Sequence, residues 1–114
     1  MKEIQLTVSL KIHSGKLEEF KTIAAECMNI VREKDTGTLQ YDWFFNQDQT
    51  ECHVREQYRD SDAILEHMAN LGDNFGRLLA ITDFSAKVYG NPSETLLKAT
   101  EGLSLVLYSS FQKM

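Results

Sequence analysis

The chain has 114 residues, enough for one domain with a buried core, and 42% of them are hydrophobic. Its formal net charge at pH 7 is -5, and its 12 Lys and Arg residues are scattered, which argues against a nucleic-acid partner. No apolar run approaches the roughly 20 residues that span a bilayer. The first residues alternate instead of forming an apolar signal segment. We therefore expect a cytoplasmic protein that does not associate with membranes.

The cysteines and histidines form no recognisable metal site. Cys27 and Cys52 lie in a predicted helix and a predicted strand and make no CxxC pair, so we expect free thiols. Together with His13, His53 and His67 they lack metal-ligand spacing. The chain has no glycine-rich phosphate loop and no dinucleotide fingerprint. We therefore expect neither a metal nor an organic cofactor.

The first half of the chain predicts a strand, a helix and a hairpin. Apolar and polar residues alternate over residues 4–12, which predicts a strand with one apolar face. Apolar residues at helical spacing then predict a helix from about 16 to 34, ended by Asp35-Thr36-Gly37. Residues 39–45 and 52–58 alternate again. The short polar connection between them indicates a hairpin.

The second half predicts a helix, a strand and an addition. Asp60 or Ser61 can cap a helix whose inner side includes His67, and Gly72 ends it. One or two further helical turns follow around residues 75–79, and residues 84–88 alternate as a fourth strand. After Pro92 we expect a short helix over residues 93–100, with Ser93 as its cap. The apolar alternation of Leu103, Leu105 and Leu107 then predicts a C-terminal strand.

The order β-α-β-β-α-β is that of the ferredoxin-like α+β fold, with a four-stranded antiparallel sheet and helices on one face. The other face needs a cover, and a second copy of the chain is the simplest one, because exposed apolar area costs about 25 cal/mol per Å². We therefore predict a homodimer. Residues 1–91 form the domain in this interpretation. Residues 92–114 form an extension that packs on the sheet edge or reaches across to the partner subunit.

Several segments in this order resemble the antibiotic biosynthesis monooxygenase (ABM) family of dimeric α/β barrels. They are the alternating first strand, GTLQYDWF after the first helix, EQYRDSDAILEH, and FSAKVYG followed by PSE. The resemblance covers roughly residues 4–90. It implies two sheets packed against each other in a homodimer, with a pocket between each subunit's sheet and helices. Members of such families include cofactor-free oxygenases of quinols and polycyclic phenols, haem-degrading enzymes and an isomerase of a phosphorylated sugar.

Two of these activities fit the residues poorly. Haem-degrading relatives use an Asn on the first strand, a Trp on the second helix and a His shortly after it. Val8 and His67 occupy the first two positions here, and residues 77–79 contain no His. The isomerase carries a His in its first helix, where this chain reads AAECMNIV. The resemblance therefore favours an oxygenase.

His67 and Glu56 are the candidate catalytic residues. His67 faces the core from its helix, and imidazole suits proton transfer near neutral pH. It is either a base or proton shuttle, or a core histidine bonded to a carboxylate or carbonyl. Glu56 shares a strand face with Val54 and Tyr58. It either orients His67 or serves only as a buried hydrogen-bond acceptor.

Aromatic side chains are the candidate pocket wall. Tyr41 and Trp43 lie on one strand face and can line a site for a flat substrate, where the hydroxyl and the indole N–H can hold an oxyanion. Asn70, one turn beyond His67, is a candidate polar pocket group, and Val8 is a candidate wall residue. Plain core packing is the alternative for the rings, and a solvated helix position is the alternative for Asn70.

These observations predict a homodimeric, cofactor-independent monooxygenase that oxidises a small-molecule quinol or polycyclic phenol with O2. Two alternatives stay open. One is a non-catalytic dimeric ligand-binding or stress-responsive protein, and the other is an isomerase of a small phosphorylated sugar. An open pocket with His67 at its wall favours the enzyme. A filled cavity favours the binding protein, and Lys or Arg side chains in the pocket favour the isomerase.

Overall fold

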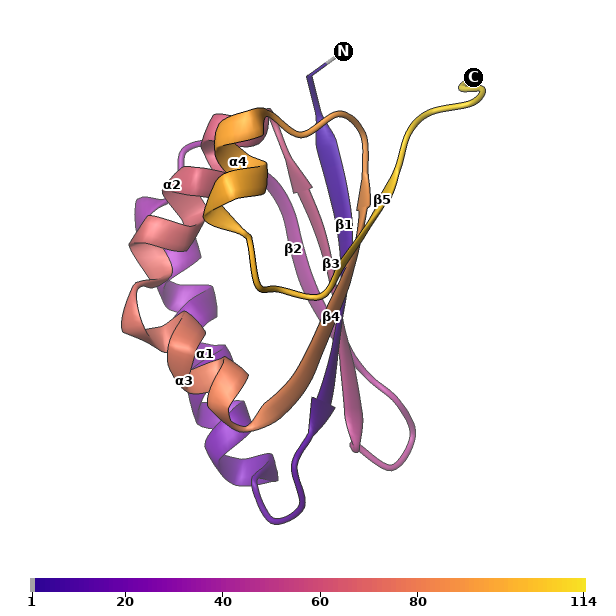
Figure 1. The fold of residues 1–114 in the computed structure, drawn as a ribbon. Coiled ribbons are helices and arrows are strands. Elements are labelled where there is room, and N and C mark those ends of the chain that lie inside the picture. Colours follow the sequence, from indigo (N-terminus) through magenta and orange to yellow (C-terminus); the bar gives the residue numbers. More distant parts are fainter. Residues whose placement is uncertain (1) are drawn as a thin grey trace.

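The computed structural model describes residues 2–114, and these form one sheet with all helices on the same side of it (Figure 1). The elements in chain order are β1 (Ile4–Ile12), α1 (Leu17–Lys34), β2 (Thr38–Phe45), β3 (Glu51–Tyr58), α2 (Ser61–Leu71), α3 (Asp73–Ala80), β4 (Thr82–Tyr89), α4 (Glu94–Ala99) and β5 (Leu105–Tyr108). None of the helices in this part of the chain is both long and apolar enough to cross a membrane.

The strand order is β2-β3-β1-β4-β5. The first four strands pair antiparallel, which confirms the predicted ferredoxin-like arrangement. The sheet has five strands instead of four, because β5 of the same chain pairs parallel to β4 at the edge. Its register places Leu105 beside Ala86 and Leu107 beside Val88. These leucines extend the apolar inner face of the sheet.

Local signals explain where the shorter helices begin and end. The Asp60 side chain accepts from the Ala63 N–H at 2.9 Å and caps α2. The Ser93 hydroxyl likewise accepts from the Leu96 N–H at 3.1 Å and caps α4, as predicted. Gly72 separates α2 from α3 with a φ of 54°, which glycine adopts without steric cost. The turn or two predicted after Gly72 is an eight-residue helix.

The core lies between the inner sheet face and the helices. Alternate residues of β1, among them Val8 and Leu10, are buried against α1 residues at helical spacing, among them Phe20, Ile23 and Cys27. The extension after Pro92 packs on this body: α4 buries Leu96 in a second apolar cluster. Cys27 and Cys52 are both buried and free.

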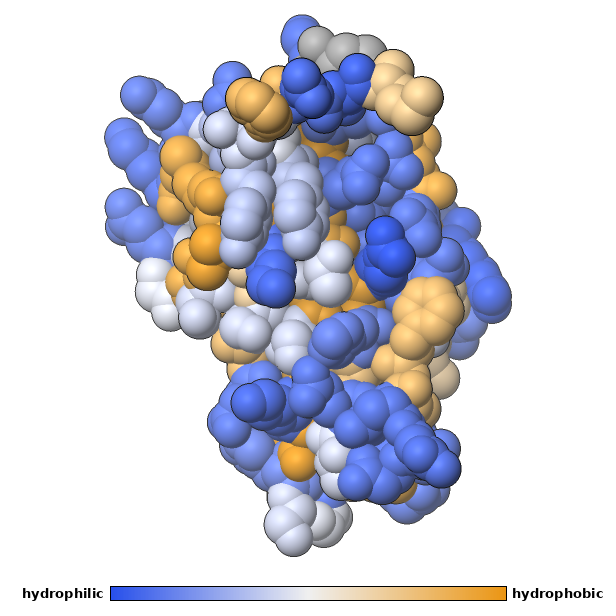
Figure 2. Space-filling view, turned by 90° about the vertical axis from the view of Figure 1, so that its right-hand side faces the viewer, coloured by the Kyte–Doolittle hydropathy of each residue, from blue (hydrophilic) through white to orange (hydrophobic). Residues whose placement is uncertain are grey.

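The open face of the sheet is mostly polar. The outward positions of β1 carry Gln5, Thr7, Ser9 and Lys11, and Figure 2 shows this face largely in blue and pale colours. Exposed apolar side chains on it include Val106, at 51% exposure, and the stacked rings of Tyr89 and Tyr108. The predicted cover is therefore not required along the whole of this face, and the homodimer stays a prediction. Hydroxyl, amide and charged side chains at alternate positions bind water on this face. The apolar area exposed there does not by itself require a partner.

Candidate active site

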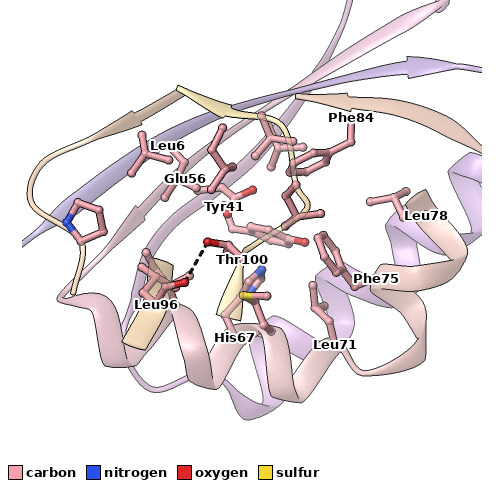
Figure 3. Close-up of a pocket in the computed structure, with 18 of the residues that line it drawn as sticks. Leu6, Tyr41, Glu56, His67, Leu71, Phe75, Leu78, Phe84, Leu96 and Thr100 are labelled. Carbon is pink, nitrogen blue, oxygen red and sulfur yellow. Dashed lines mark hydrogen bonds between the residues drawn. The ribbon is translucent and has the colours of Figure 1, made fainter. Parts of the chain in front are cut away.

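A cavity of about 80 Å³ lies between the inner sheet face and the helices α2, α3 and α4 (Figure 3). Most of its wall is hydrocarbon and aromatic. Residues from β1, such as Leu6 and Val8, line the sheet side, and Leu71 and Phe75 line the helix side. The polar residues in the wall are Tyr41, Trp43, Glu56, His67 and Thr100. An apolar cavity with a few polar groups is the usual form of a small-molecule site.

His67 projects from α2 into this site (Figure 3) and is 5% exposed. Its ring packs between Tyr41 and Tyr58, at centroid distances of 5.0 and 5.3 Å. Nδ1 lies 2.8 Å from Oδ2 of Asp35. Nε2 has no hydrogen-bond partner among residues 2–114, and the ring lines the cavity. Nε2 is therefore the nitrogen that a bound molecule can meet.

Asp35 is the partner that fixes His67. It lies directly after α1, and its side chain is 1% exposed. Its carboxylate also accepts from Asn70 Nδ2 at 2.8 Å and from Thr38 Oγ1 at 2.6 Å. Burial raises the pKa of Asp35, but the hydrogen bonds from Asn70, Thr38 and His67 outweigh burial and hold this pKa below its ordinary value.

The ionised carboxylate determines the state of the imidazole. A carboxylate only accepts hydrogen bonds, so Nδ1 of His67 carries the proton toward Asp35. Nε2 then presents its lone pair to the cavity when the ring is neutral. Asp35 thus fixes both the tautomer and the orientation of the ring. The pair His67–Asp35 is thus arranged for proton transfer at one atom, Nε2.

Glu56 lies in the cavity wall on β3, but it is not the residue that orients His67. Its carboxylate accepts from the Tyr58 hydroxyl, and Asp35 holds the imidazole instead. Burial raises the pKa of Glu56 above its ordinary value, although His67 and the Tyr58 hydrogen bond act in the opposite direction. Glu56 is therefore suited to holding a proton that it can donate to a ligand.

Two aromatic residues supply further polar atoms. Tyr41 packs edge-on against Trp43 at a centroid distance of 5.6 Å. Burial raises the pKa of Tyr41, followed by the effect of Glu56, so its hydroxyl stays protonated. Trp43 Nε1 is buried and has no hydrogen-bond partner within residues 2–114. An unsatisfied buried donor costs about 1–3 kcal/mol. The indole N–H thus has the capacity to bind an acceptor atom.

The structure brings together five of the six residues selected from the sequence: Val8, Tyr41, Trp43, Glu56 and His67 all line the cavity. Asn70 does not line it, because its side chain is turned toward Asp35. Sequence reasoning missed Asp35, which it interpreted only as part of a helix stop. The single signal for it was an acid at the end of one helix and a histidine on another. Among residues 2–114, no group of three His, Cys, Asp or Glu side chains is placed to hold a metal.

The fold and the site define a ferredoxin-like α+β protein with a mostly apolar pocket and a buried His–Asp pair. The family model described as "Antibiotic biosynthesis monooxygenase" matches residues 4–72, and the chain belongs to this family. The match includes β1, α1, β2, β3 and α2, which carry all of the ionisable pocket residues. No curated protein matches the chain significantly.

Solved structures share the fold. MupZ from Pseudomonas fluorescens is 24% identical with a TM-score of 0.79, over 100% of this chain and 94% of MupZ. SnoaB, a cofactor-independent oxygenase from Streptomyces nogalater solved as a point variant, is 14% identical with a TM-score of 0.68, over 82% of this chain and 96% of SnoaB. A conserved protein from Methanosarcina mazei Go1 is 15% identical with a TM-score of 0.69, over 78% of this chain and 92% of that protein. The MupZ similarity therefore extends over α4 and β5.

Proposed function

We propose that this protein is a cofactor-independent monooxygenase that oxidises a phenol or quinol with O2. The observation that carries the proposal is His67, whose Nε2 meets an apolar cavity while the buried Asp35 holds Nδ1. Membership in the ABM family and the fold shared with the oxygenase SnoaB support it.

The chemistry needs a base, an apolar enclosure and donors for a developing oxyanion. Nε2 of His67 removes the phenolic proton, and the anion passes one electron to O2. The resulting radical and superoxide combine into a C–O bond at a ring carbon. The peroxide then takes the proton back from His67. When its O–O bond breaks, one oxygen stays as a carbonyl on the ring carbon, and the other leaves as water with the returned proton and the one hydrogen of that carbon.

The remaining polar groups have supporting roles in this scheme. Trp43 Nε1 and a protonated Glu56 donate hydrogen bonds to the phenolic oxygen, where charge accumulates once the proton is gone. The hydrocarbon wall keeps water away from the radical pair. Tyr41 and Val8 form part of this wall.

Oxygen consumption by metal-stripped protein, with a panel of quinols and anthrone-like phenols, tests the proposal. Wild type and His67→Ala are compared, with His53→Ala as the matched control, because His53 lies on the exposed side of β3 and bonds to Glu51. We expect uptake by wild type and by His53→Ala, and none by His67→Ala. Uptake that persists in His67→Ala removes this residue from the mechanism.

The two alternatives differ in their support. A phosphorylated sugar needs cationic partners, and none of the residues that line the cavity is Lys or Arg, so we disfavour the isomerase. A non-catalytic ligand-binding protein is supported by the small cavity volume and by the satisfied Nδ1 of His67. No oxygen uptake by wild type with any compound, together with tight binding of some of them, would favour that alternative.

We further propose that the protein is a homodimer in the cytoplasm, joined through the open sheet face. Exposed rings on this face support the interface, including the stacked pair Tyr89 and Tyr108 at a centroid distance of 5.3 Å. The two free cysteines suit a reducing compartment. Light scattering at micromolar concentration tests the assembly, and a stable monomer would contradict it.

A further inference from the structure

The segment after β4 closes one side of the cavity. Six apolar residues of this segment line it, and we call them the roof: Pro92, Leu96, Leu97, Leu103, Leu105 and Leu107. Thr100 also lines the cavity, but its hydroxyl donates to the carbonyl oxygens of Leu96 at 2.9 Å and Leu97 at 3.2 Å. The hydroxyl is therefore engaged within its own helix. The roof offers a ligand hydrocarbon surface.

The ionisable groups of the cavity come from other elements. Tyr41 and Glu56 lie on β2 and β3, and His67 lies on α2 (Figure 3). The cavity thus joins one wall that binds polar atoms to another that is purely aliphatic. A ligand that contacts both the ionisable groups and the roof must itself have a polar part and a hydrocarbon part.

Two roof residues, Leu97 and Leu107, line the cavity and also reach the protein surface, and we call them the rim. Leu97 is 37% exposed and Leu107 is 49% exposed. Both are apolar, and none of the lining residues is Lys or Arg. The rim of the cavity is therefore suited to an uncharged chain that runs from the interior to the surface.

We propose that the substrate is a phenol or quinol with a hydrocarbon tail, whose ring lies at His67 and Glu56 and whose tail follows the roof to the rim at Leu97 and Leu107. The identity of the polar head rests on the proposed function. The hydrocarbon tail is inferred from the apolar side chains of the roof alone. The C-terminal extension is in this view the element that determines substrate specificity.

Binding can be measured without turnover, because Trp43 is the one tryptophan in the sequence and lines the cavity. Its fluorescence is titrated, under nitrogen, with 4-methylphenol, 4-butylphenol and 4-octylphenol. Each methylene that the roof buries is expected to tighten binding by up to about fourfold. Equal affinity along the series would overturn the proposal.

Variants locate the tail. Leu97→Ser and Leu107→Ser are expected to weaken binding of 4-octylphenol about tenfold or more and to leave 4-methylphenol unchanged. Val106→Ser is the matched control, since Val106 lies on the same strand as Leu107, is 51% exposed and does not line the cavity. Circular dichroism checks that each variant folds. Equal weakening by Val106→Ser, or none by the two roof variants, would contradict the tail site.

Oxygen uptake on the same series separates this inference from the proposed function. Affinity that grows with tail length, without oxygen uptake on this series or on the panel of quinols and anthrone-like phenols, supports the tail site and refutes the oxygenase. Oxygen uptake with affinity independent of tail length supports the oxygenase and refutes the tail site.

Discussion

Replacing Asp35 with Asn tests how strongly the buried carboxylate holds the site together. The substitution keeps the shape of the side chain and removes its charge. The carboxylate accepts three hydrogen bonds, from His67, Asn70 and Thr38, and its side chain is 1% exposed. An amide has one acceptor oxygen, and its N–H2 group faces a neighbouring donor unless Asn70 turns its own amide over.

The expected loss of stability follows from these contacts. A hydrogen bond to a charged group contributes about 1.5–3 kcal/mol and a neutral one about 0.5–1.5 kcal/mol. Part of this loss is offset, because the variant does not have to bury a charge. We therefore expect Asp35→Asn to lower the free energy of unfolding by about 2 kcal/mol at pH 7. Asp35→Ala, which leaves buried donors without an acceptor, should cost about 3–5 kcal/mol.

The pH dependence gives the sign of the effect. The pKa of Asp35 is lowered in the folded state, so its contribution is present above the unfolded value of about 3.9 and is lost as pH falls through the folded pKa. The difference between wild type and Asp35→Asn should therefore shrink below pH 4. Urea unfolding at pH 7 and in steps down to pH 3 measures it, with Asp42→Asn as the control, an exposed carboxylate on β2. Equal stability of wild type and Asp35→Asn at pH 7 would refute this account of the pair.

Three further outcomes are expected. Burial raises the pKa of Glu56, so its contribution to stability falls as pH rises above about 4.5. Glu56→Gln should therefore raise the free energy of unfolding in urea by about 1–3 kcal/mol at pH 8 and change it little at pH 4. A lower free energy of unfolding for Glu56→Gln at pH 8 would contradict this. Burial raises the pKa of Cys27 and Cys52 to about 11, so dithiobis(nitrobenzoate) at pH 8 should label neither thiol until denaturant is added, and rapid labelling of native protein would be evidence against their burial. A Cβ at Gly37 would lie 2.6 Å from Cβ of Ala63, so Gly37→Ala should lower the free energy of unfolding by about 1–3 kcal/mol. Adding Ala63→Gly removes this clash and should restore the melting temperature. Failure of that rescue would place the strain elsewhere.

The chain order of the elements could be predicted from the sequence because it depends on local periodicity. Alternation over β1 determines which side chains face the helices, and helical spacing does the same for α1. The caps at Asp60 and Ser93 and the break at Gly72 are likewise local chemistry, and the structure confirms them. The same alternation placed Tyr41, Trp43 and Glu56 on the inner face, where they line the cavity.

The polar positions of the outer face, Gln5, Thr7, Ser9 and Lys11, were also visible in the sequence. An antiparallel sheet needs a cover only where its outward side chains are apolar. Exposed apolar side chains, among them Tyr89, Val106 and Tyr108, lie beside these polar positions, and the homodimer stays a proposal.

Only the tertiary structure decided the partner of His67 and the shape of the cavity. Asp35 and His67 are 32 positions apart, and they meet because α1 ends beside α2, a packing that neither helix encodes alone. The alternation of Leu105 and Leu107 predicted a strand but not its parallel pairing with β4, which makes the extension a wall of the site. Periodicity determines which side of an element is buried. The residue it meets there depends on how distant elements pack.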